Sequence, residues 1–253
     1  MELGPRDSAR PGAVGHWEPD VDCLVLWCSP SALARSPEHR GGAPLLPLDW
    51  EDLGEQDRQR VQSHQPWEDR ARSATAALLL RRAVATVTGR PPWLVELRRE
   101  CDECGRPHGR PRLPGTGLHA SITHSGMLVG VALTAAAPVG LDVEQVTSRP
   151  VLDLVRLVSG PGEVIADSEA FYRSWCRKES VVKATGEGLR VPLQEVLVPA
   201  PAGRPGLVRV RGAELDARTT DLRPGAGYRA AVTVLTAAPA RVVQRELGAW
   251  PAH

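Results

Sequence analysis

The segment Phe171–Leu189 most constrains the fold, because it predicts one helix with charged side chains gathered on a single face. Trp175, Glu179 and Lys183 recur at every fourth position, so they lie along one face of that helix. Lys178 lies at the edge of this face, and the pattern predicts a carboxylate and two lysines directed toward a common point. A solvated surface helix with an ordinary Glu–Lys pair would show the same spacing, so both interpretations stay open here.

The rest of the chain alternates between strand and helix patterns. Asp167 or Ser168 can cap the helix just described, and Gly186 and Gly188 are residues at which it can end. Apolar runs and alternation predict strands, and apolar residues at helical spacing predict helices. We expect strands at residues 21–27, 127–134, 139–144, 206–210 and 228–235, and further helices at 68–88 and 151–158.

The strand expected at 139–144 carries two acidic residues, Asp142 and Glu144. Side chains alternate along a strand, so both carboxylates point to the same side and repel each other unless a positive charge lies between them. A hard divalent cation is the simplest occupant, and magnesium commonly combines few protein carboxylates with substrate phosphates. A lone D-x-E pattern is also common on solvated strand edges, so it needs the helix with Glu179 to support it.

Four motifs together resemble the surfactin-type 4′-phosphopantetheinyl transferases, which move phosphopantetheine from coenzyme A to carrier proteins. Gly140–Glu144 resembles the family's G-[IVL]-D-x-E, and Trp175–Leu189 resembles W-x-x-K-E-[SA]-x-x-K-x-x-G-x-G-L. Gly109–Leu113 is similar to the G-[KR]-P loop, and Ser121–Gly126 is similar to S-[IL]-S-H-S. Because the four motifs stand in the family's order, the resemblance covers most of the chain.

The resemblance implies an α+β fold of two similar α+β lobes related by a pseudo-twofold axis, with the active site in the cleft between them. The first lobe would span residues 21–137 and the second residues 138–253, with the boundary near 136–139. No internal sequence repeat shows this division independently. Residues 1–20 are polar and rich in Pro and Gly, so we expect them to be disordered.

The resemblance also implies a magnesium-dependent transfer. Asp142, Glu144 and Glu179 would hold Mg²⁺ against the pyrophosphate of coenzyme A, which is the substrate. A serine hydroxyl of an apo acyl or peptidyl carrier protein would attack the phosphate that bears the pantetheine arm. Glu179, or a water held near Glu163, would accept its proton, and Lys183 would stabilise or protonate the departing 3′,5′-ADP.

Six side chains would contact coenzyme A on the same basis: Arg72, Arg110, Thr123, His124, Lys178 and Lys183. Thr123 replaces the family's usual serine, and Arg110 stands where lysine is frequent, although arginine can still bind phosphate. His124 could instead be a satisfied histidine between strands. Lys178 suits a structural or electrostatic partner better than an acid. Arg58 and Arg60 could join Arg72 or lie on a solvated helix face.

Composition limits the classes of partner. The formal net charge of +1 argues against a general binder of nucleic acid. No apolar stretch approaches the roughly 18 to 20 residues needed to span a bilayer, and no signal peptide is evident, so we expect a cytoplasmic protein without membrane contact. The 42% hydrophobic content supports a real core. A monomer is expected from the family alone.

Two other classes compete with this interpretation. A metal-dependent phosphohydrolase acting on a nucleotide-like pyrophosphate could use the same carboxylates, but it would not need the Lys178/Lys183 helix paired with the Gly109 loop. A zinc-binding module would rest on Cys101 and Cys104 with His108, and it lacks a second ligand pair at recognisable spacing. The odd number of five cysteines suits reduced thiols better than a disulfide framework.

Overall fold

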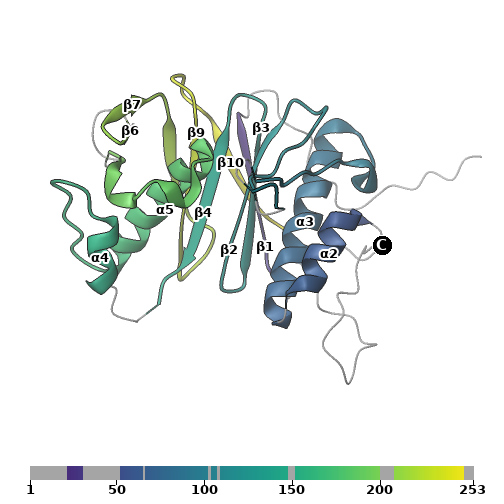
Figure 1. Ribbon diagram of the computed structural model, residues 1–253, viewed down its shortest axis with the longest axis horizontal. Helices are drawn as coiled ribbons and strands as arrows, with labels where there is room; N and C mark the ends of the chain where they lie inside the picture. The colour runs from purple at the N-terminus through teal and green to yellow at the C-terminus, as the bar shows by residue number, and fades with distance from the viewer. Residues whose placement is uncertain are drawn as a thin grey trace, which may run out of the picture.

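The computed structural model describes residues 22–30, 52–64, 66–101, 104–106, 109–147, 152–199 and 208–247. Two β-sheets lie against each other, and each outer face is covered by a helix (Figure 1). This mixture of helices and sheets confirms the expected α+β class. No helix within the described ranges is long and apolar enough to cross a membrane.

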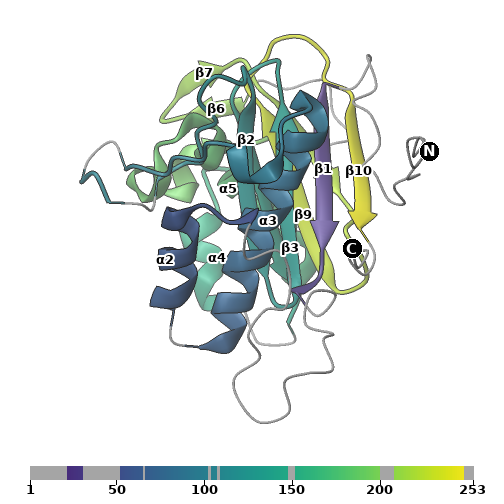
Figure 2. The ribbon, with the colours of Figure 1, turned by 90° about the vertical axis from the view of Figure 1, so that its right-hand side faces the viewer.

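The first sheet has four strands in the order β10-β1-β3-β2. β1 runs parallel to β10 and antiparallel to β3, and β3 is also antiparallel to β2. In Figure 2, β10 lies beside β1 at one edge of this sheet. The strand bounds are β1 Cys23–Cys28, β2 His119–Ser125, β3 Leu128–Thr134 and β10 Val242–Leu247.

The second sheet has the antiparallel order β4-β9-β8, and a small third sheet has the order β5-β6-β7. The strand bounds are β4 Val139–Gln145, β5 Val196–Leu197, β6 Val208–Val210, β7 Ala213–Leu215, β8 Arg218–Leu222 and β9 Tyr228–Val234. β4 therefore forms one edge of its sheet, and its free edge faces β2 of the first sheet.

Two long helices dominate the outer layers. α3 lies against the first sheet and ends at Gly89, whose φ of 69° is left-handed, as expected for a C-terminal glycine. α5 lies against the second sheet, and its capping agrees with the sequence: Asp167 accepts a 2.7 Å hydrogen bond from Ala170 N, and Gly186 has a φ of 78°. The helix bounds are α2 Glu55–Ser63, α3 Trp67–Thr88, α4 Leu152–Val158 and α5 Ser168–Thr185, with 3₁₀ turns η2 Pro92–Leu94, η3 Gly188–Arg190 and η4 Leu193–Glu195.

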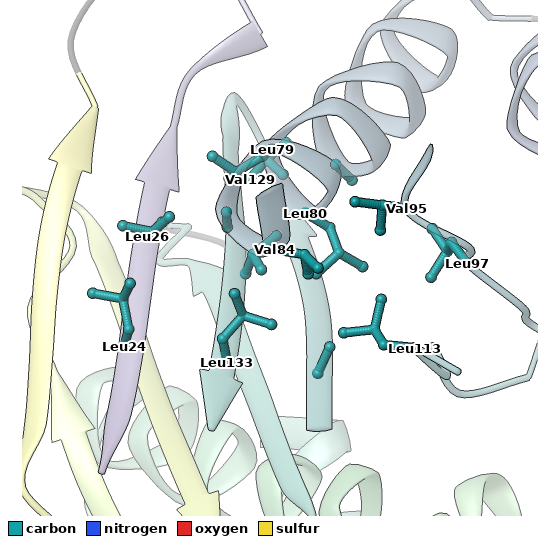
Figure 3. Close-up of a cluster of buried hydrophobic side chains, with 14 of the residues drawn as sticks. Leu24, Leu26, Leu79, Leu80, Val84, Val95, Leu97, Leu113, Val129 and Leu133 are labelled. Carbon is teal, nitrogen blue, oxygen red and sulfur yellow. The ribbon is translucent and has the colours of Figure 1, made fainter. Parts of the chain in front are cut away.

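The alternation of β1 explains why all six of its residues are buried. Leu24 and Leu26 pack with α3 in the core between this helix and the first sheet (Figure 3). Val25 and Trp27 point the other way and pack in the core between the two sheets. A strand that is covered on both faces needs a continuous apolar run rather than an alternating one, and β1 has such a run.

The predicted long elements agree with the structure to within a few residues, but, besides the 3₁₀ turns, six elements were not predicted: α2, β2, β5, β7, β8 and β10. β10 carries Gln244, Arg245 and Glu246 among its apolar residues, so its sequence gives little strand signal. The predicted boundary assigns β10 to the second lobe, whereas its residues pair with β1 in the first sheet. The disorder expected for residues 1–20, the first two residues of the strand expected at 206–210, and His108 lie outside the described residues.

Candidate active site

Gly140 brings α5 against β4. A Cβ atom at this position would lie 1.9 Å from the carbonyl oxygen of Ser180 and 2.5 Å from the amide nitrogen of Ala184, both backbone atoms of α5. Only glycine allows the helix to approach the strand this closely. The approach places the Glu179 and Lys183 face of α5 next to the acidic residues of β4.

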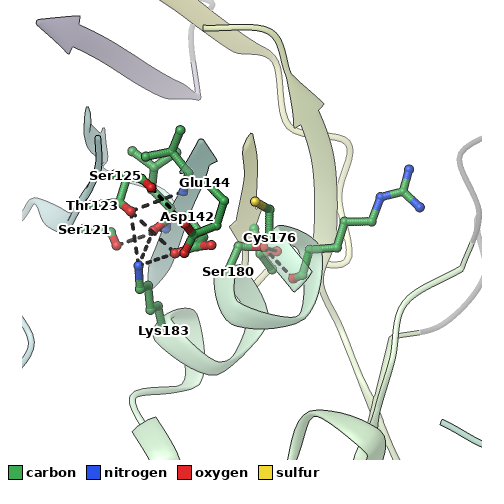
Figure 4. A network of polar contacts seen from close by, with 12 residues as sticks. Ser121, Thr123, Ser125, Asp142, Glu144, Cys176, Ser180 and Lys183 are labelled. Atoms are coloured by element: carbon green, nitrogen blue, oxygen red, sulfur yellow. Dashed lines mark hydrogen bonds and ion pairs between the residues drawn. The ribbon is translucent and has the colours of Figure 1, made fainter. Parts of the chain in front are cut away.

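Lys183 binds β4 and β2 at once (Figure 4). Its Nζ donates to Asp142 Oδ1 at 2.6 Å, to the carbonyl oxygen of Leu141 at 3.1 Å and to Thr123 Oγ1 at 3.3 Å. The Asp142 side chain is 6% exposed and the Lys183 side chain 32% exposed, so this ion pair joins a buried carboxylate to a lysine that keeps partial access to solvent. The structure therefore brings three predicted residues from three elements into direct contact.

Two more carboxyl groups lie close to this pair. The pKa of Glu179 is raised, first by burial and then by the charge of Asp142. The pKa of Glu144 is raised by burial, an effect opposed by the hydrogen bond from Ser125, and the charges of Asp142 and Glu179 also raise it. Buried carboxyl groups that repel one another in this way gain from a nearby cation.

The donor chemistry of this cluster fits Mg²⁺. Among the described residues, Asp142 Oδ2 is buried and accepts no N–H or O–H hydrogen bond, and the Cys176 thiol interacts with the same side chain. A buried carboxylate oxygen in this position gains from contact with a cation or water. Oxygen ligands from Asp and Glu are those that magnesium prefers. Within the described ranges, no three His, Cys, Asp or Glu side chains converge closely enough to hold a metal as they stand, and the Lys183 ammonium supplies the positive charge next to Asp142.

The first sheet and α3 add cationic groups to the same site. Arg72 Nη1 donates to the carbonyl oxygen of Gly126 at 3.1 Å, and its Nη2 pairs with Asp69. The pKa of His124 is lowered by desolvation and then by the charges of Arg72 and Lys183, although the residue keeps solvent access. Arg72 of α3, His124 of β2 and Lys183 of α5 are thus close enough to interact electrostatically, and this arrangement suits an anionic ligand.

Arg110 lies at the other end of the site. Its Nη1 donates to the carbonyl oxygen of Ala184 at 3.1 Å, near the C-terminal end of α5. Its charge, after desolvation, also lowers the pKa of His119 on β2. The loop that carries Arg110 therefore contacts the helix that carries Glu179 and Lys183, as the motif order alone could not show.

Lys178 and Glu163 lie in a different environment. Lys178 Nζ pairs with Glu163 and donates to the carbonyl oxygens of Val158 at 2.7 Å and Leu193 at 3.2 Å. With 1% of its side chain exposed, Lys178 uses all three N–H groups to join α5 to the end of α4 and to η4.

The prediction that the helix directs both lysines to one point is therefore wrong for Lys178. Positions five residues apart are separated by about 140° around a helix, so Lys178 and Lys183 face apart. This placement favours a structural role for Lys178 over contact with coenzyme A. Glu163 accepts a second hydrogen bond from Gly160 N at 2.9 Å, which leaves it bound within its own turn.

The sequence analysis missed three side chains at the site. Ser121 and Ser125 on β2 bond to β4, and the signal that could have found them is the period-two spacing of hydroxyl groups in Ser121–Ser125. Cys176 Sγ donates to the carbonyl oxygen of Arg229 at 3.2 Å. Burial, followed by the charges of Asp142 and Glu144, raises the pKa of this thiol, so it stays protonated next to the carboxylates.

Comparison with known proteins supports the motif assignment. Residues 138–233, which contain β4, α5 and β9, match the model of the 4′-phosphopantetheinyl transferase superfamily. A 4′-phosphopantetheinyl transferase of Bacillus subtilis is 31% identical over 140 residues, which is 52% of this chain and 59% of the relative. Over residues 138–233 the chain is therefore similar to the 4′-phosphopantetheinyl transferase superfamily.

A Synechocystis sp. protein provisionally named as a member of this superfamily is 25% identical over 166 residues. That match covers 61% of this chain and 65% of the relative. The chain thus matches less than two thirds of the length of either relative of the superfamily. The matched region contains the carboxylate strand and the lysine helix, so the similarity to the family model covers this part of the site.

The cysteines leave the zinc interpretation without support from the described residues. Cys101 and Cys104 form no disulfide within the described residues, and Cys104 is exposed. His108 lies outside the described residues. Cys23, Cys28 and Cys176 are buried free thiols, which agrees with the expectation of reduced cysteines.

Proposed function

We propose that this chain transfers the 4′-phosphopantetheine group from coenzyme A to a serine of an acyl or peptidyl carrier protein and releases 3′,5′-ADP. One observation carries the proposal. Within the part of the chain that the structure describes, Asp142 has a buried oxygen that accepts no N–H or O–H hydrogen bond, at the point where β4, β2 and α5 bring Glu144, Thr123 and Lys183 together. The superfamily match over residues 138–233, which include Asp142, Glu144 and Lys183, supports it.

Asp142, Glu144 and Glu179 would hold Mg²⁺ in this proposal. When bound, the metal would neutralise charge on the pyrophosphate of coenzyme A during phosphoryl transfer. The raised pKa values of Glu144 and Glu179 support this assignment, because buried carboxyl groups that repel one another are stabilised in their ionised form by a nearby cation. The ammonium of Lys183 already supplies one such charge.

The transfer breaks the bond between the phosphorus that bears the pantetheine arm and the bridging oxygen of 3′,5′-ADP. The serine oxygen of the carrier forms the new bond to phosphorus, and its proton must leave. Glu179 is the better acceptor of the two acids proposed, because Glu163 is paired with Lys178 and accepts from Gly160 N. Lys183, whose side chain is 32% exposed, would stabilise or protonate the leaving oxygen.

Coenzyme A would bind along the side of the site that α3, β2 and the loop around Arg110 provide. Arg72 and His124 would contact its phosphates. Desolvation, followed by the charges of Arg72 and Lys183, lowers the pKa of His124, and these two positive charges support a site that favours anions. Arg110 would bind a phosphate through charge-assisted hydrogen bonds. Thr123 keeps the hydroxyl of the family's usual serine and already bonds Lys183 and β4.

The proposal includes two α+β lobes related by a pseudo-twofold axis, with residues 21–137 in the first and 138–253 in the second. α3 packs against the first sheet and α5 packs against the second sheet, and this arrangement supports such a division. β10 would then return from the second lobe to pair with β1. We also propose a cytoplasmic monomer that acts on carrier-protein domains and has no nucleic-acid or membrane partner.

The decisive experiment incubates the purified chain with coenzyme A and Mg²⁺, with and without an apo carrier protein. Transfer appears as a mass increase on the carrier and as 3′,5′-ADP in solution, and both should disappear with EDTA. Carrier proteins of fatty acid, polyketide and nonribosomal peptide pathways, at matched concentrations, identify the preferred partner. Consumption of coenzyme A without any carrier would contradict the proposal and indicate a phosphohydrolase.

A further inference from the structure

Three hydroxyl groups on β2 join the two sheets. The side chains of Ser121, Thr123 and Ser125 accept hydrogen bonds from the backbone N–H groups of residues 141, 143 and 145 on β4, at 3.0, 3.2 and 3.0 Å. Each pair is separated by 20 residues, so the two strands run in the same direction side by side (Figure 4). β2 and β4 are not paired through their backbones, and these side chains take the place of a strand partner.

The alternation of β2 makes this possible. Ala120 and Ile122 face the α3 core, so the hydroxyl groups between them face β4. An edge strand buried at its open side would otherwise leave its N–H groups without partners, at a cost of about 1–3 kcal/mol each. The hydroxyl groups remove that cost because each accepts one N–H bond and keeps a proton to donate.

The three hydroxyl groups differ in where that proton goes. Ser125 donates to Glu144 Oε2 at 2.8 Å, a short and direct bond. Thr123 lies 3.4 Å from Asp142 Oδ1 and accepts from Lys183 as well. Ser121 bonds the amide of Leu141 and contacts neither Asp142 nor Glu144 in any described hydrogen bond. Of the three hydroxyl groups, only that of Ser125 donates a short hydrogen bond to a carboxylate of the site while it also accepts a hydrogen bond from the backbone of β4.

We propose that Ser125 is a positioning residue for metal binding. Its oxygen is anchored by the amide of Gln145, and its proton holds one oxygen of Glu144, so the other carboxylate oxygen is left to face a cation. Ser121 belongs to the same set of hydroxyl groups but only joins the strands. This inference rests on the proposed function for the identity of the metal site, and it adds a residue that acts on the site through Glu144.

The two serines offer a matched pair of variants with opposite expected effects. Ser121 and the amide of Leu141 are buried, so Ser121→Ala should lower the unfolding midpoint. Ser125 and Gln145 are more accessible, so water can replace that hydroxyl and Ser125→Ala should change the midpoint less. For metal affinity, Ser125→Ala should have the larger effect, because removing a group that orients a metal ligand commonly lowers the affinity for the metal 10-fold or more.

The experiment titrates Mn²⁺ into wild-type protein, Ser121→Ala and Ser125→Ala in the presence of coenzyme A, with free Mn²⁺ read by electron paramagnetic resonance. We expect Ser125→Ala to weaken Mn²⁺ binding about 10-fold, Ser125→Thr to restore it, and Ser121→Ala to leave it near wild type. Turnover of Ser125→Ala should recover at high Mg²⁺, because the ligands themselves remain. Ser125→Cys, which keeps a similar volume but bonds weakly, serves if the alanine variant does not fold.

The outcomes separate this inference from the proposed function. Equal losses of Mn²⁺ affinity in Ser121→Ala and Ser125→Ala would mean that the hydroxyl groups only join the strands, which overturns the positioning role. Wild-type Mn²⁺ affinity in Ser125→Ala, with carrier transfer intact in the wild-type protein, would overturn the inference alone. A wild-type protein that binds no Mn²⁺ would overturn both the inference and the metal site.

Discussion

The substitution Gly140→Ala tests whether close contact between α5 and β4 builds the site. The added Cβ would meet two backbone atoms of α5, the Ser180 oxygen at 1.9 Å and the Ala184 nitrogen at 2.5 Å. Backbone atoms of a helix cannot rotate away as a side chain can. The helix must move outward by at least about 1 Å before these contacts become tolerable.

That movement has two consequences of calculable size. Overpacking a well-filled interior lowers the free energy of unfolding by about 1–3 kcal/mol. It also carries Lys183 and Glu179 away from Asp142, to which Lys183 is now bonded at 2.6 Å. A displacement of about 1 Å at reacting groups can reduce the rate about 100-fold. We therefore expect Gly140→Ala to remain folded at low temperature while its turnover falls by about 100-fold.

The assay combines urea unfolding, followed by circular dichroism, with mass spectrometry of phosphopantetheine transfer to an apo carrier at the same temperature. Gly117→Ala is the control, because its added Cβ has nothing within 4 Å although its φ is +69°. It should cost about 1 kcal/mol through backbone strain and leave turnover unchanged. The reasoning fails if Gly140→Ala unfolds at the wild-type urea concentration and keeps wild-type turnover, since α5 could not then lie against β4 as described.

Three further predictions concern side chains of the site. Asp142→Ala and Glu179→Ala should each abolish transfer in folded protein, and more than about a tenth of wild-type turnover at saturating Mg²⁺ would remove that residue from the ligand set. Arg110→Ala should raise the KM for coenzyme A more than it lowers kcat, whereas a raised KM for the carrier would place Arg110 on the docking surface. Lys183→Arg should lower turnover with little loss of stability, while Lys178→Arg, at a site with 1% of the side chain exposed, should lower the unfolding free energy by about 1–3 kcal/mol. Full turnover in Lys183→Arg would mean that this residue supplies only positive charge.

Local sequence patterns predict the two elements that carry the site, α5 and β4. For α5 the sequence predicts a cap at Asp167 or Ser168 and an end at Gly186 or Gly188, because capping groups act on neighbouring residues. The structure has the cap at Asp167 and the end at Gly186. The β4 strand was predicted with Asp142 and Glu144 on one side, because alternation is a property of the extended backbone. Both kinds of signal depend only on residues close in the chain.

Helix geometry alone predicts that Lys178 and Lys183 point in different directions. A separation of five positions turns Lys178 about 140° away from Lys183 around the helix axis. What the sequence could not give is the environment of Lys178. Its three acceptors come from Val158, Glu163 and Leu193, which lie 15 to 20 residues away in the chain.

The sequence by itself determined the resemblance to a family, the carboxylate strand and the lysine helix, since each rests on contiguous motifs. Only the tertiary structure decided how they meet. The joining of β2 to β4 by hydroxyl groups, the return of β10 to β1, and the approach of α5 to Gly140 each bring together residues that are separated along the chain. Such contacts depend on which surfaces the packed core leaves facing each other, and no local propensity encodes that arrangement.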